Sequence, residues 1–208
     1  MPIHTITLPS PTATTPDAWT TVQLVDATDG SAPEQATEVS LAATSDALWV
    51  RFECADRHAW GTYTERDDPL WQEEAVEVFL APATDEPFPR RYVEVEVSPL
   101  GTVFDAIVEN PYGDRREMTV DTSWDWLELE AGVEPMGSAE DWRATLRLPW
   151  AGVLAVFGLE ALPRRWRLNV YRIERPRDGE AEFSAWSPTW VTPADFHRPE
   201  RFGFLEFG

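Results

Sequence analysis

The run YVEVEV, residues 92–97, decides the fold, because its polar and apolar side chains alternate without a break. Successive side chains of a β-strand point to opposite faces of the sheet. The three valines therefore share one face, and Tyr92, Glu94 and Glu96 share the other. This pattern predicts a strand that turns its valine face toward an apolar core.

The same period of two recurs along the chain. In LWVRFEC, residues 48–54, Leu48 and Cys54 share an apolar face, which makes Cys54 a structural thiol rather than a nucleophile. In VEVFL, residues 76–80, the apolar positions oppose Glu77 and Phe79. Further strands are expected over residues 37–43, 102–108, 124–134, 141–148, 166–174 and 202–207, and helical turns only over residues 149–158 and 69–75. The sequence predicts an all-β sandwich in one domain, residues 1–208, with residues 1–16 as an extended N-terminal segment.

The charge of the chain excludes two classes of partner. The sequence holds 37 acidic and 17 basic residues, which gives a formal net charge of −20. Nucleic acid and an anionic membrane surface would both be repelled by this field. No segment has the length and apolar character of a membrane span, and the first residues do not resemble a signal peptide. We expect a protein that is cytoplasmic as the chain stands and secreted if a signal was removed.

Three glutamates are expected to crowd one face of the predicted sheet. If the strands over residues 76–80 and 92–97 are neighbours, Glu77, Glu94 and Glu96 lie together on the face away from the valines. Like charges in cross-strand positions repel one another. Either this face is solvated, or the charge is compensated by Arg51, by Arg172, by a bound cation or by a ligand rich in hydroxyl donors.

No spacing in the sequence identifies a catalytic site. A glycoside hydrolase needs two carboxylates across a cleft, and among 37 acids no pair stands out. A glycan-active enzyme with paired carboxylates therefore remains the alternative function. No serine lies in a G-x-S-x-G turn, which argues against a Ser-His-Asp hydrolase.

No cofactor is required by the sequence pattern, but two are considered. Calcium prefers oxygen ligands in loops, and a structural calcium is compatible with several loop carboxylates: Asp26, Asp29, Asp67 and Asp68. A haem-binding sandwich is a less favoured alternative, whose axial ligands would come from Met118, Met136, His58 and His197.

Aromatic residues are the stronger indication of function. Eleven tryptophans are present, and Trp71 follows a proline in a loop instead of lying inside a strand. A ring exposed in a loop offers an apolar face to the C–H face of a sugar, while neighbouring polar groups bind its hydroxyls. Trp60, Trp186 and Trp190 also lie outside the predicted strands, with Phe196 close behind.

These stretches together resemble the family 9 carbohydrate-binding modules. The resemblance is carried by DALWVRFECAD, DPLWQEEAVEVFL, YVEVEVSPLG, WRATLRLPW, RLNVYRIE and the final WSPTWVTPADFHRPERFGFLEF, and it spans residues 17–208. It implies an immunoglobulin-like antiparallel β-sandwich, often with structural calcium, that grips the terminal sugar of a glycan between two aromatic side chains without turnover. The implied partner is an oligo- or polysaccharide, with a catalytic partner protein as a further candidate.

The resemblance also implies roles for particular residues. Trp71 matches one aromatic wall, Glu77 a hydroxyl acceptor, and Phe196 the position of a second aromatic wall, which is usually tryptophan. Trp190 lies near enough in sequence to replace it. Where the family has a sugar-binding arginine, this chain has Glu94 and Glu96 beside Tyr92. The missing donors are expected from Arg172, flanked by Asn169 and Tyr171, because a guanidinium fork can satisfy two hydroxyls.

Overall fold

The strand with the strictest alternation lies near the middle of the larger sheet. In the computed structural model, which describes residues 3–126, 128–137, 140–176 and 179–208, β7 (Arg91–Val97) pairs with β6 (Ala75–Pro82) and β8 (Val103–Glu109). Its three valines are fully buried. The valine face of β7 therefore lies against the core, as the sequence predicts.

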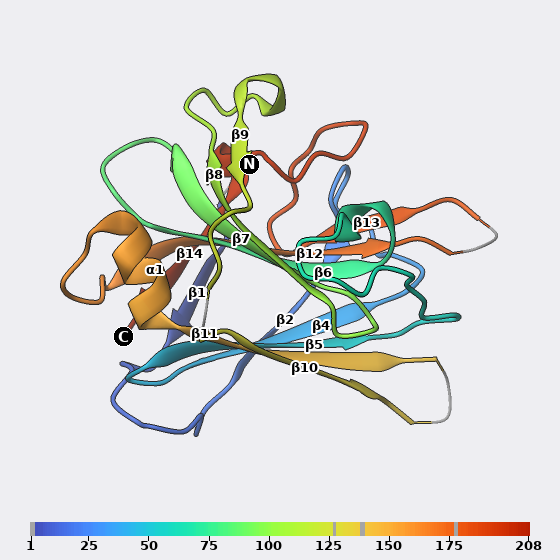
Figure 1. Ribbon diagram of the computed structural model, residues 1–208, viewed down its shortest axis with the longest axis horizontal. Helices are drawn as coiled ribbons and strands as arrows, with labels where there is room; N and C mark the ends of the chain where they lie inside the picture. Colours follow the sequence, from blue (N-terminus) through green and yellow to red (C-terminus); the bar gives the residue numbers. More distant parts are fainter. Residues whose placement is uncertain (1–2, 127, 138–139, 177–178) are drawn as a thin grey trace.

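The described residues form two sheets that pack face to face (Figure 1). The larger follows the order β1-β14-β12-β6-β7-β8-β9, in which β1 is Thr5–Leu8, β14 is Gly203–Phe207, β12 is Arg165–Glu174 and β9 is Thr119–Asp121. Two short strands extend it beside β12: β13 (Glu182–Ala185) and β3 (Val25–Asp26). The smaller sheet follows the order β10 (Glu130–Pro135), β11 (Trp142–Pro149), β5 (Ala47–Cys54), β4 (Thr37–Ala43) and β2 (Thr20–Gln23).

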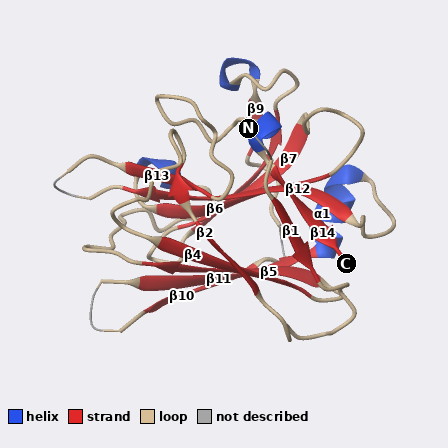
Figure 2. Ribbon diagram, turned by 180° about the vertical axis from the view of Figure 1, so that it is seen from behind, coloured by secondary structure: helices blue, strands red, loops and turns tan. Residues whose placement is uncertain are grey.

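Figure 2 shows the two layers from behind. The hydrophobic core fills the space between them. It combines the inward side chains of the larger sheet with those of the smaller, Val50 and Phe52 among them. Cys54 is fully buried there, and burial raises the pKa of its thiol to about 12, which is the expected behaviour of a structural cysteine. The predicted β-sandwich is confirmed.

The described helices are short. The helix α1 (Trp150–Phe157) begins after Pro149 and ends at Gly158, whose φ of 63° is the left-handed conformation that glycine adopts easily. Three 3₁₀ turns, η1 (Leu70–Gln72), η2 (Arg115–Glu117) and η3 (Pro199–Arg201), lie in loops. Both predicted helical turns are therefore present. None of these helices combines the length and apolar character that crossing a bilayer requires.

One predicted strand is shorter than expected. The alternation over residues 124–134 predicts a strand from Trp124, whereas β10 begins at Glu130; Leu127 lies outside the described residues. The Asp121 carboxylate accepts hydrogen bonds from Ser123 and forms a turn, and the Trp126 backbone N–H donates to Asp105. Tertiary packing buries Trp126 in the core, so it does not continue the strand.

The N-terminal segment is extended, as expected, but part of it belongs to the larger sheet. Strand β1 pairs with β14 in parallel, while the other strand pairs of the two sheets are antiparallel. Ile6 and Leu8 of β1 enter the core. The ring of His4, which precedes β1, approaches the backbone oxygen of Trp186 at 2.9 Å.

Candidate functional site

Three glutamates converge on the outer face of the larger sheet. Glu77 of β6 lies directly opposite Glu96 of β7, and Glu94 follows two residues earlier on the same face of β7. Carboxylate oxygens from the three residues lie within 4.8 Å of one another. The side chains are only 1 to 4% exposed. The interpretation of this face as solvated is therefore wrong, because loops cover it.

The covering loops leave a cavity of about 460 Å³ above these carboxylates. We call Glu77, Glu94 and Glu96 the floor of the cavity. Two apolar clusters occupy the same face of the sheet on either side of the floor; one contains Phe79 and Tyr92, and the other contains Phe104. The walls therefore come from loop residues together with rings that the sheet itself supplies.

Trp71 forms an exposed wall of this cavity. It lies in η1, directly before β6, and is 39% exposed. Its ring contacts Phe104 edge to face at 5.2 Å between centroids, and its backbone oxygen accepts a hydrogen bond from Arg175 at 3.2 Å. The ring is held in place while part of its surface stays open to a ligand.

Phe196 lines the cavity from the loop that follows β13, but it is mostly buried. Its ring stacks on Tyr171 at 4.1 Å between centroids and 14° between planes, and it is 7% exposed. The Tyr171 hydroxyl also donates to the backbone oxygen of Phe196 at 3.0 Å. Phe196 therefore belongs to the packed cluster beneath the cavity as much as to its wall.

Burial and mutual repulsion shift the floor carboxylates toward the neutral form. Desolvation raises the pKa of Glu94 to about 7, while Glu96 and Arg115 act to lower it. The pKa values of Glu77 and Glu96 are raised well above the usual range, first by desolvation and then by the neighbouring glutamates. The floor thus shares protons at neutral pH instead of carrying three full charges.

Basic and neutral polar groups from distant loops complete the cavity. Arg115 of η2 and Arg175, which follows β12, both line it. His197 lines it as well, and its Nδ1 lies 2.8 Å from the Tyr92 hydroxyl. Burial lowers the pKa of His197 to about 3, so its ring is neutral. Sequence reasoning did not assign these three residues to a sugar site, because each lies outside the long strands, in a segment whose position depends on the whole fold.

Of the residues suggested by the sequence, five line the cavity: Trp71, Glu77, Glu94, Glu96 and Phe196. Four others lie elsewhere. Tyr171 is buried within the aromatic cluster, and the amide of the buried Asn169 donates to the Tyr171 hydroxyl at 2.8 Å. Trp190 packs against Gly30, where an added Cβ would meet its ring at 2.7 Å.

Comparison with known proteins decides the family. The model of "Carbohydrate-binding family 9" matches residues 13–207, which is nearly the whole chain. The chain belongs to carbohydrate-binding family 9. An "Extracellular protein" of Arthroderma benhamiae (strain ATCC MYA-4681 / CBS 112371) is 26% identical over 194 residues, which cover 86% of this chain and 83% of the relative.

Solved structures support the same fold. A protein of Bacteroides uniformis ATCC 8492 for which carbohydrate binding has been suggested superposes with a TM-score of 0.74 at 15% identity, over 100% of both chains. A family 9 module of Caldicellulosiruptor kristjanssonii in complex with glucose superposes with a TM-score of 0.61 at 14% identity, over 99% of this chain and 96% of the module. A family 9 module from the same organism in complex with cellotriose superposes with a TM-score of 0.59 at 14% identity, over 98% of this chain and 92% of the module.

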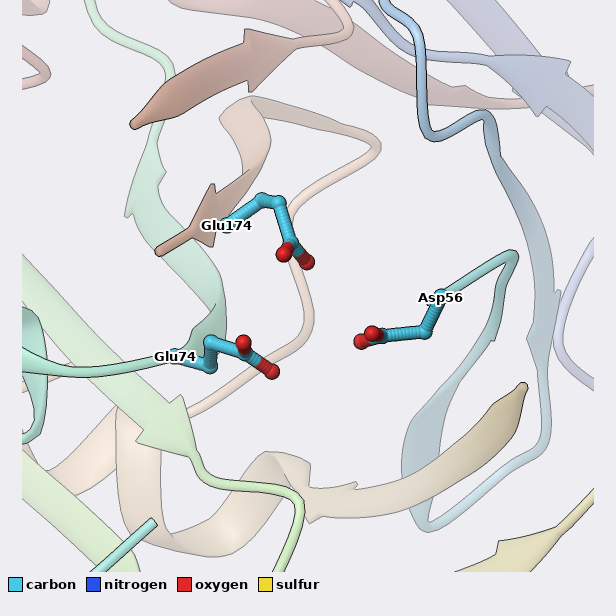
Figure 3. Close-up of side chains that lie close together, drawn as sticks. All are labelled: Asp56, Glu74 and Glu174. Atoms are coloured by element: carbon cyan, nitrogen blue, oxygen red, sulfur yellow. The ribbon is translucent and has the colours of Figure 1, made fainter. Parts of the chain in front are cut away.

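Arg172 lies inside the sandwich, away from the cavity of this family 9 chain. Its guanidinium is 1% exposed and bonds to Asp56 at 2.9 Å and to Glu174. Asp56, Glu174 and Glu74 point toward one another in Figure 3. Arg172 supplies the cation between two of them, so its role here is structural.

This second acidic group does not fit the calcium that family 9 membership suggests. Asp56 already accepts hydrogen bonds from Trp142, Arg172 and the backbone of His58, and Glu174 accepts from Arg172. The Glu74 Oε1 atom has no partner among the described residues. Calcium takes six to eight oxygen ligands, and this single oxygen without a partner does not supply them.

The loop carboxylates suggested for calcium are engaged in turns. Asp26 accepts three local hydrogen bonds, from Thr28 and Asp29, and Asp29 accepts one from Ser31. The Asp67 carboxylate accepts a hydrogen bond from the backbone N–H of Asp105, and the Asp68 carboxylate accepts from the backbone N–H groups of residues 64 and 65. Structural calcium stays a prediction without an assigned site.

Two residues considered as haem ligands, Met118 and His197, do line the same cavity. The floor beneath them consists of carboxylates, which would repel the propionates of a haem wherever they are ionised. The hydroxyls of a neutral sugar, in contrast, donate to carboxylates. The composition of the cavity therefore favours the carbohydrate-binding role over the haem alternative.

Proposed function

We propose that the cavity binds one sugar unit of a glycan and holds it without cleaving it. The observation that carries this proposal is a cavity of about 460 Å³ with an exposed tryptophan in its wall and three carboxylates in its floor, in a family 9 chain. Pockets of a few hundred Å³ suit small ligands. The ring of Trp71 packs against the C–H face of the sugar, and Glu77 accepts hydrogen bonds from its hydroxyls.

The shape of the site favours the end of a glycan chain. The floor carboxylates are nearly inaccessible to solvent, and the β-sheet lies directly beneath them. A sugar that reaches the floor cannot continue as a chain in that direction. A terminal unit therefore enters the cavity, and the rest of the glycan leaves past Trp71 and Arg115 toward solvent.

Replacement of two tryptophans tests the proposed site. We expect Trp71→Ala to abolish detectable binding on a glycan array while the melting temperature changes little, because the ring is exposed. Trp190→Ala is the matched control, since Trp190 does not line the cavity. Loss of binding in Trp190→Ala with retained binding in Trp71→Ala would place the sugar elsewhere.

The arrangement of the carboxylates argues against catalysis. Glycosidases place an acid and a nucleophile or base on either side of the glycosidic bond. Here the three carboxylates project side by side from one sheet face, and their oxygens lie within 4.8 Å of one another. We expect no product above the buffer rate when the protein is incubated with oligosaccharides and chromogenic glycosides. Turnover that Glu94→Gln abolishes would show instead that the protein is an enzyme.

A further inference from the structure

The floor of the cavity holds more acceptors than the protein supplies with donors. No ion pair of the described residues involves Glu77, Glu94 or Glu96; Arg115, which acts to lower the pKa values of Glu77 and Glu94, lies 3.9 Å from Asp195 instead. The Glu96 Oε2 atom is buried and has no hydrogen-bond partner in the described part of the chain. A buried acceptor without a donor costs about 1 to 3 kcal/mol, so the floor is suited to a ligand that brings donors.

The chemistry of the floor matches an ammonium group better than a hydroxyl. A protonated amine carries a positive charge and three N–H donors, one for each carboxylate, whereas a hydroxyl is neutral and donates once. The positive charge also favours the ionised form of the floor carboxyls, which share protons at neutral pH in its absence. Aromatic rings of Trp71, Phe104 and Phe196 surround the same space, and ring faces attract cations.

Resting on the proposed function, we propose that the cavity selects a sugar unit with a protonated amine, such as a 2-amino-2-deoxyhexose, whose ammonium group lies on the floor among Glu77, Glu94 and Glu96. The two arginines of the cavity do not prevent this. The Arg115 side chain is 55% exposed, so water screens its charge, and Arg175 bonds to the backbone of Trp71.

A divalent cation is a poorer match to the same floor. Calcium takes six to eight oxygen ligands. Three carboxylates face this space, and the groups around them include the rings of Trp71, Phe104 and Phe196, which offer no oxygen. A single ammonium group is satisfied by three acceptors.

The experiment compares matched sugars on the intact protein by isothermal titration calorimetry. Glucosamine and galactosamine are each titrated beside the parent hexose and the N-acetylated sugar, which lacks the charge. We expect the amino sugars to bind about tenfold tighter or more than the parent hexoses, the difference expected for hydrogen bonds to charged groups. The N-acetylated sugars should bind no tighter than the parent hexoses.

The pH dependence of the affinity gives an independent readout. The affinity for glucosamine should rise with pH as Glu94, with a pKa of about 7, loses its proton, and fall again as the amine loses its own. Glu77 and Glu96, whose pKa values are also raised by burial, change charge in the same direction as Glu94, whereas His197 is already neutral and the pKa of the Tyr92 phenol is raised by burial. The affinity for glucose should lack this maximum, and a flat profile for glucosamine would contradict the proposal.

Two matched variants distinguish the role of the floor carboxylates from the general effect of losing a buried carboxylate. Glu96→Gln should reduce the preference for amino sugars to less than threefold, because an amide is neutral and less attractive to a cation. Glu74→Gln, the same replacement at a buried glutamate outside the cavity, should keep the preference. If Glu96→Gln does not fold, as judged by its melting temperature, Glu94→Gln replaces it.

The outcomes distinguish the inference from the proposed function. Equal or tighter binding of the parent hexoses would overturn the amine preference and leave the proposed sugar site intact. Binding of calcium chloride that Glu96→Gln abolishes, with no preference for amines, would identify a cation site and overturn the inference. No binding of any glycan on an array would overturn the proposed function together with the inference.

Discussion

At the scale of single residues, the two aromatic walls differ in what supports them. Trp71 is held by an edge contact and remains 39% exposed, whereas Phe196 stacks on Tyr171 within a buried cluster. Sequence reasoning assigned both residues to the wall of the site and did not distinguish them. The sequence could not show the stacking, because Tyr171 and Phe196 come from separate segments.

Phe196→Ala should therefore destabilise the protein. Removal of a buried phenylalanine ring costs about 3 to 5 kcal/mol of the free energy of unfolding. Urea unfolding followed by circular dichroism measures this difference, and Trp71→Ala serves as the comparison with little expected change. A Phe196→Ala variant as stable as the parent protein would mean that the Tyr171 stack contributes little.

At the scale of elements, the long alternating runs could be predicted and the short strands could not. The strands over residues 37–43 and 92–97 agree with β4 and β7 to within one residue. Strands β1, β3 and β9 have two to four residues, too few for a period of two to be distinguished from chance. The floor of the cavity followed from the register of long strands, while its rim depends on loops.

Strand β1 should matter for stability although it lies at the edge of the sheet. Leu8 is fully buried in the core, and Thr7, its neighbour, points to solvent. Leu8→Ala should lower the free energy of unfolding by about 2 to 5 kcal/mol, because it leaves a cavity in the core. Thr7→Ala is the control and should change it little. Equal effects of both replacements in urea unfolding would argue against the burial of β1.

At the scale of the whole molecule, several buried glutamates have pKa values above their usual range. Burial raises the pKa of Glu74 to about 9 from an ordinary 4.5, and the floor glutamates are raised as well. A group whose pKa is higher in the folded than in the unfolded protein stabilises the fold at low pH and loses this effect as the pH rises through the folded value. His197 acts in the opposite direction, but only below its ordinary pKa of 6.5.

The melting temperature should therefore fall between pH 7 and pH 9. Differential scanning calorimetry at high salt checks this, since salt screens the repulsion that a net charge of −20 adds at the surface. Glu74→Gln, which stays neutral at every pH, should show a shallower decline. A melting temperature that rises over this range, or the same slope in both proteins, would mean that Glu74 ionises freely in the folded state.

The exposure of Trp71 has an optical consequence. Of the eleven tryptophans in the chain, it alone is among the large hydrophobic residues that are exposed. A dissolved quencher such as acrylamide should reach this indole first, so the quenchable part of the intrinsic fluorescence originates mainly from the cavity mouth. A glycan that covers the ring should protect that emission and shift it to shorter wavelength, which would let affinities be measured without any label.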